Sequence, residues 1–97
     1  MADQDTILLV DDEPDLAAML SEFLVGEGHV VRVAPTGAAA RAIVATTPIA
    51  LMLLDLELPD VGGVSLMGEI QHSASEPDIV IITGHASLES EIGRAHV

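Results

Sequence analysis

Oxygen-bearing side chains follow three of the apolar stretches in this 97-residue sequence. Asp11 and Asp12 come directly after one stretch, Asp55 after a second, and Thr83 after a third. If these stretches are neighbouring parallel strands, three carboxylates and a hydroxyl meet at the sheet edge where ligands bind in open α/β sheets. Carboxylates that close together repel, so the cluster needs a cation, and an all-oxygen ligand set suits Mg2+.

A simpler interpretation of the acidic pair is also open. Acids are favourable at a helix N-terminus, so Asp11 and Asp12 could form no more than a charge patch ahead of the next helix. The matching strand-end positions of Asp55 and Thr83 favour a shared site over that patch.

The order of elements predicts the sheet that such a site needs. Four stretches rich in Ile, Leu and Val alternate with three helix-like segments, which gives the order β-α-β-α-β-α-β, right-handed crossovers and a parallel α/β sheet covered on both faces. The strands are expected at residues 6–10, 30–34, 49–54 and 79–82. The last two are continuously apolar, as strands buried on both faces are.

The helices have starts and ends that the sequence marks. Pro14 suits the first turn of the first helix, and we expect its apolar face to hold Leu16, Leu20, Phe23 and Leu24. The second helix follows Thr36, a favourable N-cap. The third spans about residues 64–72 and is weakened by Gly68. Met52 and Met67 are expected to fill the core.

Composition excludes several classes of function. Three Arg, no Lys and 16 acids give a net charge of -13, which disfavours binding to nucleic acid or anionic lipid. There is no Cys, the N-terminal residues are acidic rather than basic, and the longest apolar run is too short to span a bilayer. We therefore expect one small cytoplasmic domain without a membrane segment.

Three motifs resemble the response-regulator receiver domains of two-component signalling, in order and spacing. They are LLVDDEP at residues 8–14, LLDLELPDVGG at 53–63 and IITGH at 81–85. The resemblance covers residues 6 to about 90, and it implies a flavodoxin-like, doubly wound parallel sheet of order 2-1-3-4-5. Gly62 stands where the family usually has a polar residue, a departure expected to loosen the loop without removing the chemistry.

The resemblance also implies a role for each site residue. Asp55 would accept the phosphoryl group, with Asp12 as a direct Mg2+ ligand, Asp11 acting mostly through water, and the backbone carbonyl of Glu57 as a further ligand. Thr83 would donate a hydrogen bond to a phosphoryl oxygen. The partner would be a sensor histidine kinase or a phosphotransfer protein, and dimerisation of the full-length protein is left open.

The function predicted is that of a phospho-acceptor switch in a phosphorelay, not of a turnover enzyme. The alternative is a pseudo-receiver, which would bind partners without phosphorylation; the intact acids favour the switch. A metal-dependent phosphohydrolase would use Glu57 as general acid, but Pro59 and the receiver-like motifs weigh against it. In the family pattern Glu57 and His85 tune the lifetime of the phosphoryl group. For Glu57 a solvated side chain is the favoured explanation, whereas for His85 solvent exposure explains the residue equally well.

The C-terminal residues depart from the receiver pattern. The spacing of the four strands places a fifth beyond Val97, so we expect the fifth strand, the last helix and the family's phosphoryl-binding Lys to be missing. Residues 91–97 fit the codons GAGATCGGAAGAGCACACGTC, which after the first letter match a widely used short-read sequencing adapter. The predicted organisation is therefore a partial receiver at residues 1–90 and an adapter-derived segment at residues 91–97.

Overall fold

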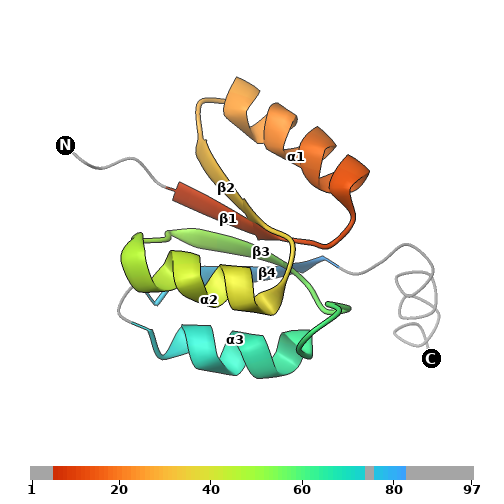
Figure 1. The fold of residues 1–97 in the computed structure, drawn as a ribbon. Helices are drawn as coiled ribbons and strands as arrows, with labels where there is room; N and C mark the ends of the chain where they lie inside the picture. The colour runs from red at the N-terminus through yellow and green to blue at the C-terminus, as the bar shows by residue number, and fades with distance from the viewer. Residues whose placement is uncertain (1–5, 74–75, 83–97) are drawn as a thin grey trace, which may run out of the picture.

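The strands of the computed structural model form one parallel sheet (Figure 1). The structure describes residues 6–73 and 76–82, and within them the strand order is β2-β1-β3-β4. The strands are β1 (Thr6–Val10), β2 (Val30–Ala34), β3 (Leu51–Asp55) and β4 (Asp78–Ile82). The predicted parallel sheet and its 2-1-3-4 order are confirmed.

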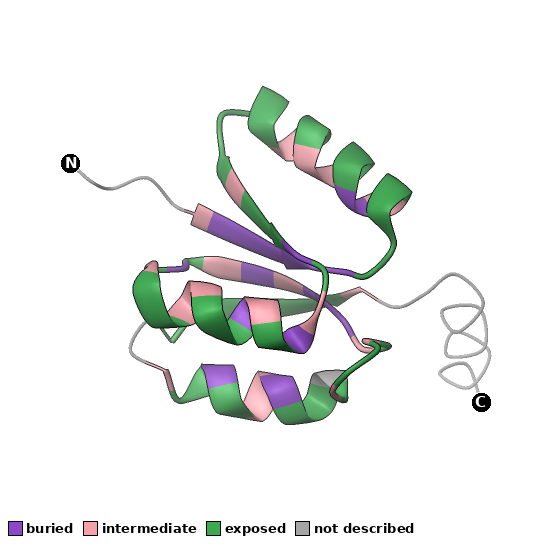
Figure 2. Ribbon diagram, in the orientation of Figure 1, coloured by how far each residue is buried: buried purple, intermediate pink, exposed green. Residues whose placement is uncertain are grey.

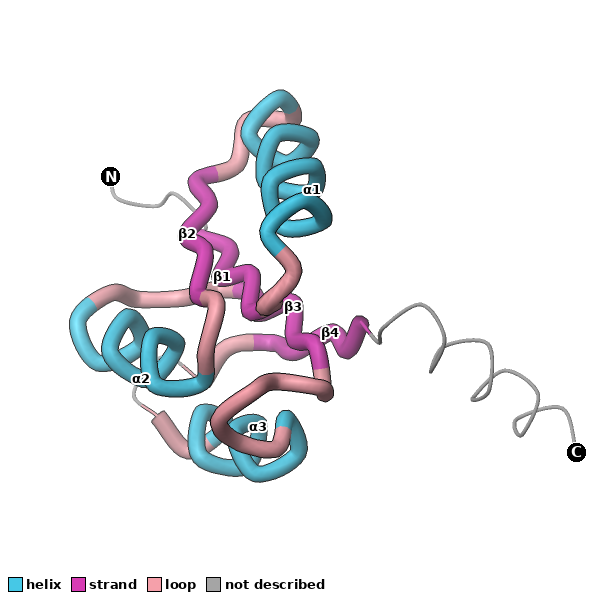
Figure 3. The backbone as a smooth tube through the Cα atoms, turned by 45° about the vertical axis from the view of Figure 1, so that its right-hand side comes forward, coloured by secondary structure: helices cyan, strands magenta, loops and turns pink. Residues whose placement is uncertain are grey.

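Three helices within the described residues connect these strands and lie on both faces of the sheet. They are α1 (Pro14–Gly26), α2 (Gly37–Thr46) and α3 (Gly63–Gln71). α1 lies on one face, whereas α2 and α3 lie on the other (Figure 1, Figure 3). None of the described helices is both long and apolar enough to cross a membrane.

The element bounds follow the predictions with small shifts. β1 and β2 have the predicted bounds, while β3 begins two residues late and includes Asp55 as its last residue. Ile49 is nevertheless buried, and the N–H of Ala50 donates to the Thr6 carbonyl at 3.0 Å, so the chain already runs beside β1 before β3 begins. Thr36 is the N-cap of α2, and its hydroxyl accepts a bond from Ala39 N–H at 3.1 Å.

The main core lies between the sheet and the pair α2 and α3 (Figure 2). Side chains alternate between the two faces of a strand, and Leu8 of β1 lies beside Met52 of β3 on this face. Met52 is fully buried and Met67 packs against the cluster, which confirms both as core residues. The buried cluster contains Leu8, Val10, Ala34, Ala40, Ile49, Met52, Leu54, Leu66 and Ile70.

The opposite face, under α1, is covered less completely. Ile7 and Leu9 of β1 are buried, but in α1, which is described throughout, Ala17 is the one buried residue. The expectation that Phe23 belongs to the inward face is wrong, because its side chain is 63% exposed. The half-buried residues of α1 include a stripe spaced four apart, and Phe23 lies beside that stripe. The stripe consists of Leu16, Leu20 and Leu24.

β4 is the outer strand of the described sheet and is less buried than its sequence suggests. Val80 is 48% exposed and Ile81 is 44% exposed. Consecutive strand residues point to opposite faces, so both faces of β4 carry uncovered apolar surface. The expectation of a strand buried on both faces is therefore wrong for β4 within the described residues.

Candidate functional site

The acidic cluster lies where two central strands end. Asp11 follows β1 directly and Asp55 ends β3, and these strands pair in parallel with Val10 beside Leu54. Oxygens of Asp11, Asp12 and Asp55 all lie within 4.8 Å of one another. The structure thus brings together the three carboxylates that the strand-end pattern predicted.

The two inner carboxylates are fixed by their own backbone. Asp11 Oδ1 accepts a bond from Glu13 N–H at 2.9 Å, and Asp55 Oδ1 accepts one from Glu57 N–H at 2.9 Å. Such bonds to the amide two residues ahead are typical of Asp in turns. Each bond uses one of two carboxylate oxygens. Asp11 and Asp55 are 3% and 6% exposed, whereas Asp12 is exposed to solvent.

Without a cation, burial of Asp55 and repulsion between the three carboxylates destabilise the ionised cluster. Burial raises the pKa of Asp55 above its ordinary value, the Glu57 N–H opposes that rise, and the charges of Asp11 and Asp12 add to it. The ion pair found among the described residues, Arg41 with Glu69, joins α2 to α3 rather than serving these acids. An oxygen-binding divalent cation would relieve the repulsion.

The residues fit a Mg2+ site by the type and grouping of their donor atoms. The three carboxylates supply hard oxygen ligands. Asp11 and Asp55 are buried, whereas the exposed Asp12 leaves that side of the cluster open to water. The backbone of Glu57 lies next to the cluster, because its N–H is bonded to Asp55, and its side chain is exposed. The predicted role of the Glu57 carbonyl stays a prediction.

Thr83 and His85 lie outside the described residues, so their predicted roles stay predictions. The register does give the position of the residue that precedes Thr83. Ile82, the last residue of β4, pairs with Asp55 at the same end of the sheet.

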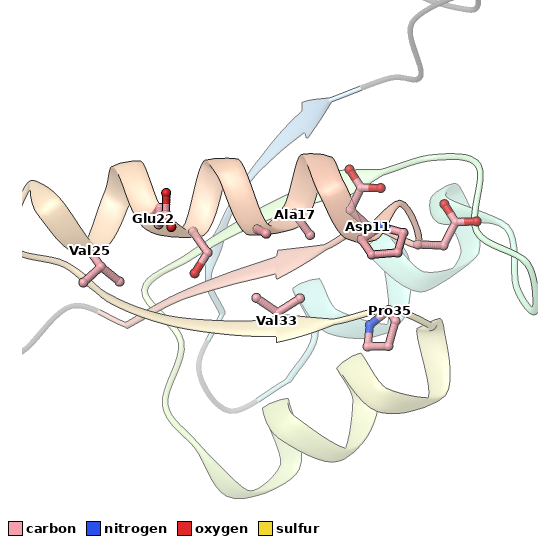
Figure 4. Close-up of a pocket in the computed structure, with 10 residues that line it drawn as sticks. Asp11, Ala17, Glu22, Val25, Val33 and Pro35 are labelled. Atoms are coloured by element: carbon pink, nitrogen blue, oxygen red, sulfur yellow. The ribbon is translucent and has the colours of Figure 1, made fainter.

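A groove runs from the acids along α1 (Figure 4). It has a volume of about 610 Å³ and lies between α1 and the end of β2. Asp11 and Asp12 line one end, and Val25 and Val33 line the apolar stretch farther along. This groove could not be predicted from the sequence, because its presence depends on how far α1 stands from β2.

Asp60 is the functional candidate that the sequence analysis missed. It lies in the loop between β3 and α3, and its two carboxylate oxygens accept bonds from Gly37 N–H at 2.9 Å and Ala38 N–H at 3.1 Å. The bond from Gly37 is the main reason that the pKa of Asp60 lies below its ordinary value. An Asp just before a predicted helix suggests a local cap, but here the acid caps a different helix.

Gly62 stands at the point where the loop after β3 turns into α3. Gly62 is the N-cap of α3 with φ -67°, a conformation open to any residue, and nothing lies within 4 Å of a Cβ placed there. Conformation and space at Gly62 therefore do not demand glycine, in agreement with an ordinary loop.

Comparison with known proteins decides the family. Residues 7–95 match the sequence model of the response regulator receiver domain. The chain belongs to the response-regulator receiver family. A receiver domain is a signalling domain of two-component systems, so the predicted family and fold are both confirmed. The match runs past residue 90, and the domain boundary expected there stays a prediction.

Named relatives and solved structures agree with this membership. The receiver is 36% identical over 80 residues to the TorCAD operon transcriptional regulatory protein TorR of Escherichia coli O157:H7, covering 82% of this chain and 34% of that protein. The chain thus spans about a third of the length of that relative.

Two solved receivers have the same fold. A CheY-like receiver domain protein of Methanospirillum hungatei gives a TM-score of 0.81 at 28% identity, covering 96% of this chain and 74% of that one. Response regulator TrrA of Thermotoga maritima, solved in complex with Mg2+-BeF, gives 0.78 at 29% identity, covering 95% and 80%.

Proposed function

We propose that this receiver domain accepts a phosphoryl group on Asp55, with Mg2+ held by Asp11, Asp12, Asp55 and the backbone carbonyl of Glu57. The observation that carries the proposal is the grouping of three carboxylates within 4.8 Å at the carboxyl end of the central strands. The solved complex of TrrA with Mg2+-BeF supports it by family likeness.

Phosphoryl transfer to Asp55 requires the protein mainly to place the carboxylate and to neutralise its charge. An ionised Asp55 is already a nucleophile and needs no general base. The divalent cation supplies charge neutralisation, which lets an anionic donor approach an anionic acceptor. Glu57 N–H holds Asp55 Oδ1 at 2.9 Å and so fixes the orientation of the carboxylate, while its other oxygen is the candidate for attack on phosphorus.

The remaining parts of the proposal concern residues and partners outside the described site. Thr83 follows Ile82, which pairs with Asp55, and we assign Thr83 the hydrogen bond to a phosphoryl oxygen. The donor is a phosphohistidine of a sensor histidine kinase or phosphotransfer protein: its P–N bond breaks as the bond from phosphorus to the Asp55 oxygen forms. The output is a downstream effector, and the location is cytoplasmic.

Uptake of a phosphoryl mimic tests the acceptor directly. Fluorine NMR of the full chain with Mg2+ and beryllofluoride should show a bound resonance that disappears in Asp55→Asn. Asp78→Asn makes the same substitution at the first residue of β4, at the opposite end of the sheet, and should leave the resonance intact. An undiminished bound resonance in Asp55→Asn would place the acceptor elsewhere.

A further inference from the structure

The loop that follows the acceptor is fastened to a helix from another part of the chain. Asp60 is five residues after Asp55, and its carboxylate accepts bonds from the N–H groups of Gly37 and Ala38, the first two residues of α2. The partners are 23 and 22 residues apart in sequence. This contact therefore links the β3–α3 loop to α2 through side-chain chemistry and not through local chain geometry.

The first turn of α2 depends on the Asp60 carboxylate, which belongs to the β3–α3 loop. A helix leaves its first N–H groups without partners inside the helix. The cap residue Thr36 serves one of them, since its hydroxyl accepts from Ala39 N–H. Asp60 accepts from the N–H groups of Gly37 and Ala38, so the helix start is completed only when the loop is in place.

Side-chain packing holds the loop against the same turn. Val61, the residue after Asp60, packs against the main core. A Cβ placed on Gly37 would run into Val61 Cγ1, so the absence of a side chain at Gly37 lets the loop approach the helix this closely. Two independent features, a bidentate hydrogen bond and a steric fit, therefore fix this end of the loop.

The other end of the loop is fixed at the acceptor itself. Glu57 N–H donates to Asp55 Oδ1, and Glu57 also pairs with Gly62 in an isolated antiparallel bridge. The backbone at Glu57 is thus held between the acceptor and the segment that contains Asp60. A shift of Asp60 would displace Glu57, whose N–H orients the Asp55 carboxylate.

We propose that Asp60 is a positioning residue for the acceptor site: by binding the start of α2 it sets the backbone at Glu57 and hence the geometry of Asp55 and its metal ligands. This inference rests on the proposed phospho-acceptor function, which it deepens. It also makes the start of α2 a part of the molecule that responds when the acceptor site is occupied.

Matched variants separate positioning from simple helix capping. Asp60→Ala removes the cap supplied by the loop, whereas Thr36→Ala removes the cap that α2 supplies for itself. Both should lower thermal stability, but only Asp60→Ala frees the loop. Asp60→Asn keeps a single acceptor oxygen and should give an intermediate result, and it remains measurable if the alanine variant unfolds.

Three readouts on the full chain test the proposal. In metal-free protein, amide hydrogen exchange at Glu57 and Val61 should accelerate in Asp60→Ala by about five- to tenfold over Thr36→Ala, the change expected from losing one cap of typical strength. The dissociation constant for Mg2+ should rise by a similar factor. In wild type, beryllofluoride should shift the amide resonances of Gly37 and Ala38, and Asp60→Asn should reduce those shifts.

The outcomes distinguish this inference from the function on which it rests. Equal loop exchange in Asp60→Ala and Thr36→Ala would overturn the positioning role, as would equal Mg2+ affinity in these two variants. Failure of wild type to bind Mg2+ would count against the proposed function. In that case exchange in the metal-free loop still decides whether Asp60 holds it.

Discussion

At the scale of single residues, Asp55 combines a requirement of its chemistry with a cost to the fold. Its carboxylate is 6% exposed and lies within 4.8 Å of two further acids, and burial raises its pKa. The folded chain therefore binds this proton more tightly than the unfolded chain does. The resulting stabilisation is complete below the ordinary pKa of about 3.8 and is lost as the pH rises through the raised pKa.

Asp55→Asn should consequently stabilise the metal-free chain at neutral pH. Removing one charge from the cluster should be worth on the order of 1 kcal/mol, or about 4–8 °C in Tm for a domain of this size. The gain should shrink as the pH falls towards 4, because the wild-type carboxyl then becomes neutral. Thermal unfolding in EDTA at several pH values measures it, with Asp78→Asn as control; a lower Tm for Asp55→Asn at pH 7 would contradict this account.

The residues of the site were predictable to different degrees. Asp11, Asp12 and Asp55 could be grouped from sequence because each follows an apolar strand, and parallel strands end at one edge. Asp60 could not be assigned, because capping rules are local and its helix begins 23 residues earlier. Phe23 was misplaced because helical periodicity gives a face but not the angle at which that face meets the sheet.

At the scale of elements, periodicity and capping predicted the helices and strands well. Thr36 marked the start of α2 because a hydroxyl that accepts from Ala39 N–H is a local feature. The end of β3 was less well predicted, because Asp55 belongs to the ladder and pairs with Ile82 despite its charge. Pairing with neighbours overrides the low strand preference of Asp.

Two glycines give opposite predictions for the same substitution. Gly37→Ala should destabilise the chain by about 1–3 kcal/mol, because the new Cβ meets Val61 and the loop has to move. Gly68→Ala should instead stabilise it by about 0.5–1 kcal/mol, since Gly68 lies inside α3 with nothing within 4 Å of a Cβ. Urea unfolding of both variants measures the difference. A destabilised Gly68→Ala would contradict the open space at Gly68, and a neutral Gly37→Ala would contradict the close contact with Val61.

At the scale of the whole molecule, the two faces of the sheet are unequally covered. The α2 and α3 side holds the large buried cluster (Figure 2). Ala17 is the one buried residue of α1, on the other side, and Val80 and Ile81 of β4 are exposed. Among the described strands β4 pairs with β3 alone, and an outer strand with uncovered apolar side chains is a template for pairing with other chains. A continuous apolar run says nothing of what covers it, but the strand spacing, which places a fifth strand beyond Val97, already predicts an uncovered apolar edge at residues 79–82.

Extending the 97-residue chain with a receiver-type fifth strand and last helix should therefore raise its Tm and reduce self-association. The added strand would pair with β4, and the added helix would cover one face of the sheet. A Gly/Ser extension of equal length is the control. Calorimetry and sedimentation velocity give the two readouts, and the same behaviour from both extensions would show that β4 needs no further partner.

The lone ion pair between described residues, Arg41 with Glu69, has a consequence for how this protein responds to its solvent. Its two side chains are 45% and 49% exposed, so solvent screens the pair and it adds little stability, while the chain carries a net charge of -13. Raising the ionic strength from 0.01 M to 0.15 M shortens the Debye length from about 30 Å to about 8 Å. Salt therefore weakens the repulsion among the many acids more than it weakens the attraction within this ion pair, and NaCl should raise Tm. A salt titration in which Tm falls would refute this prediction. The domain is thereby a polyelectrolyte whose folded state depends on its counterions.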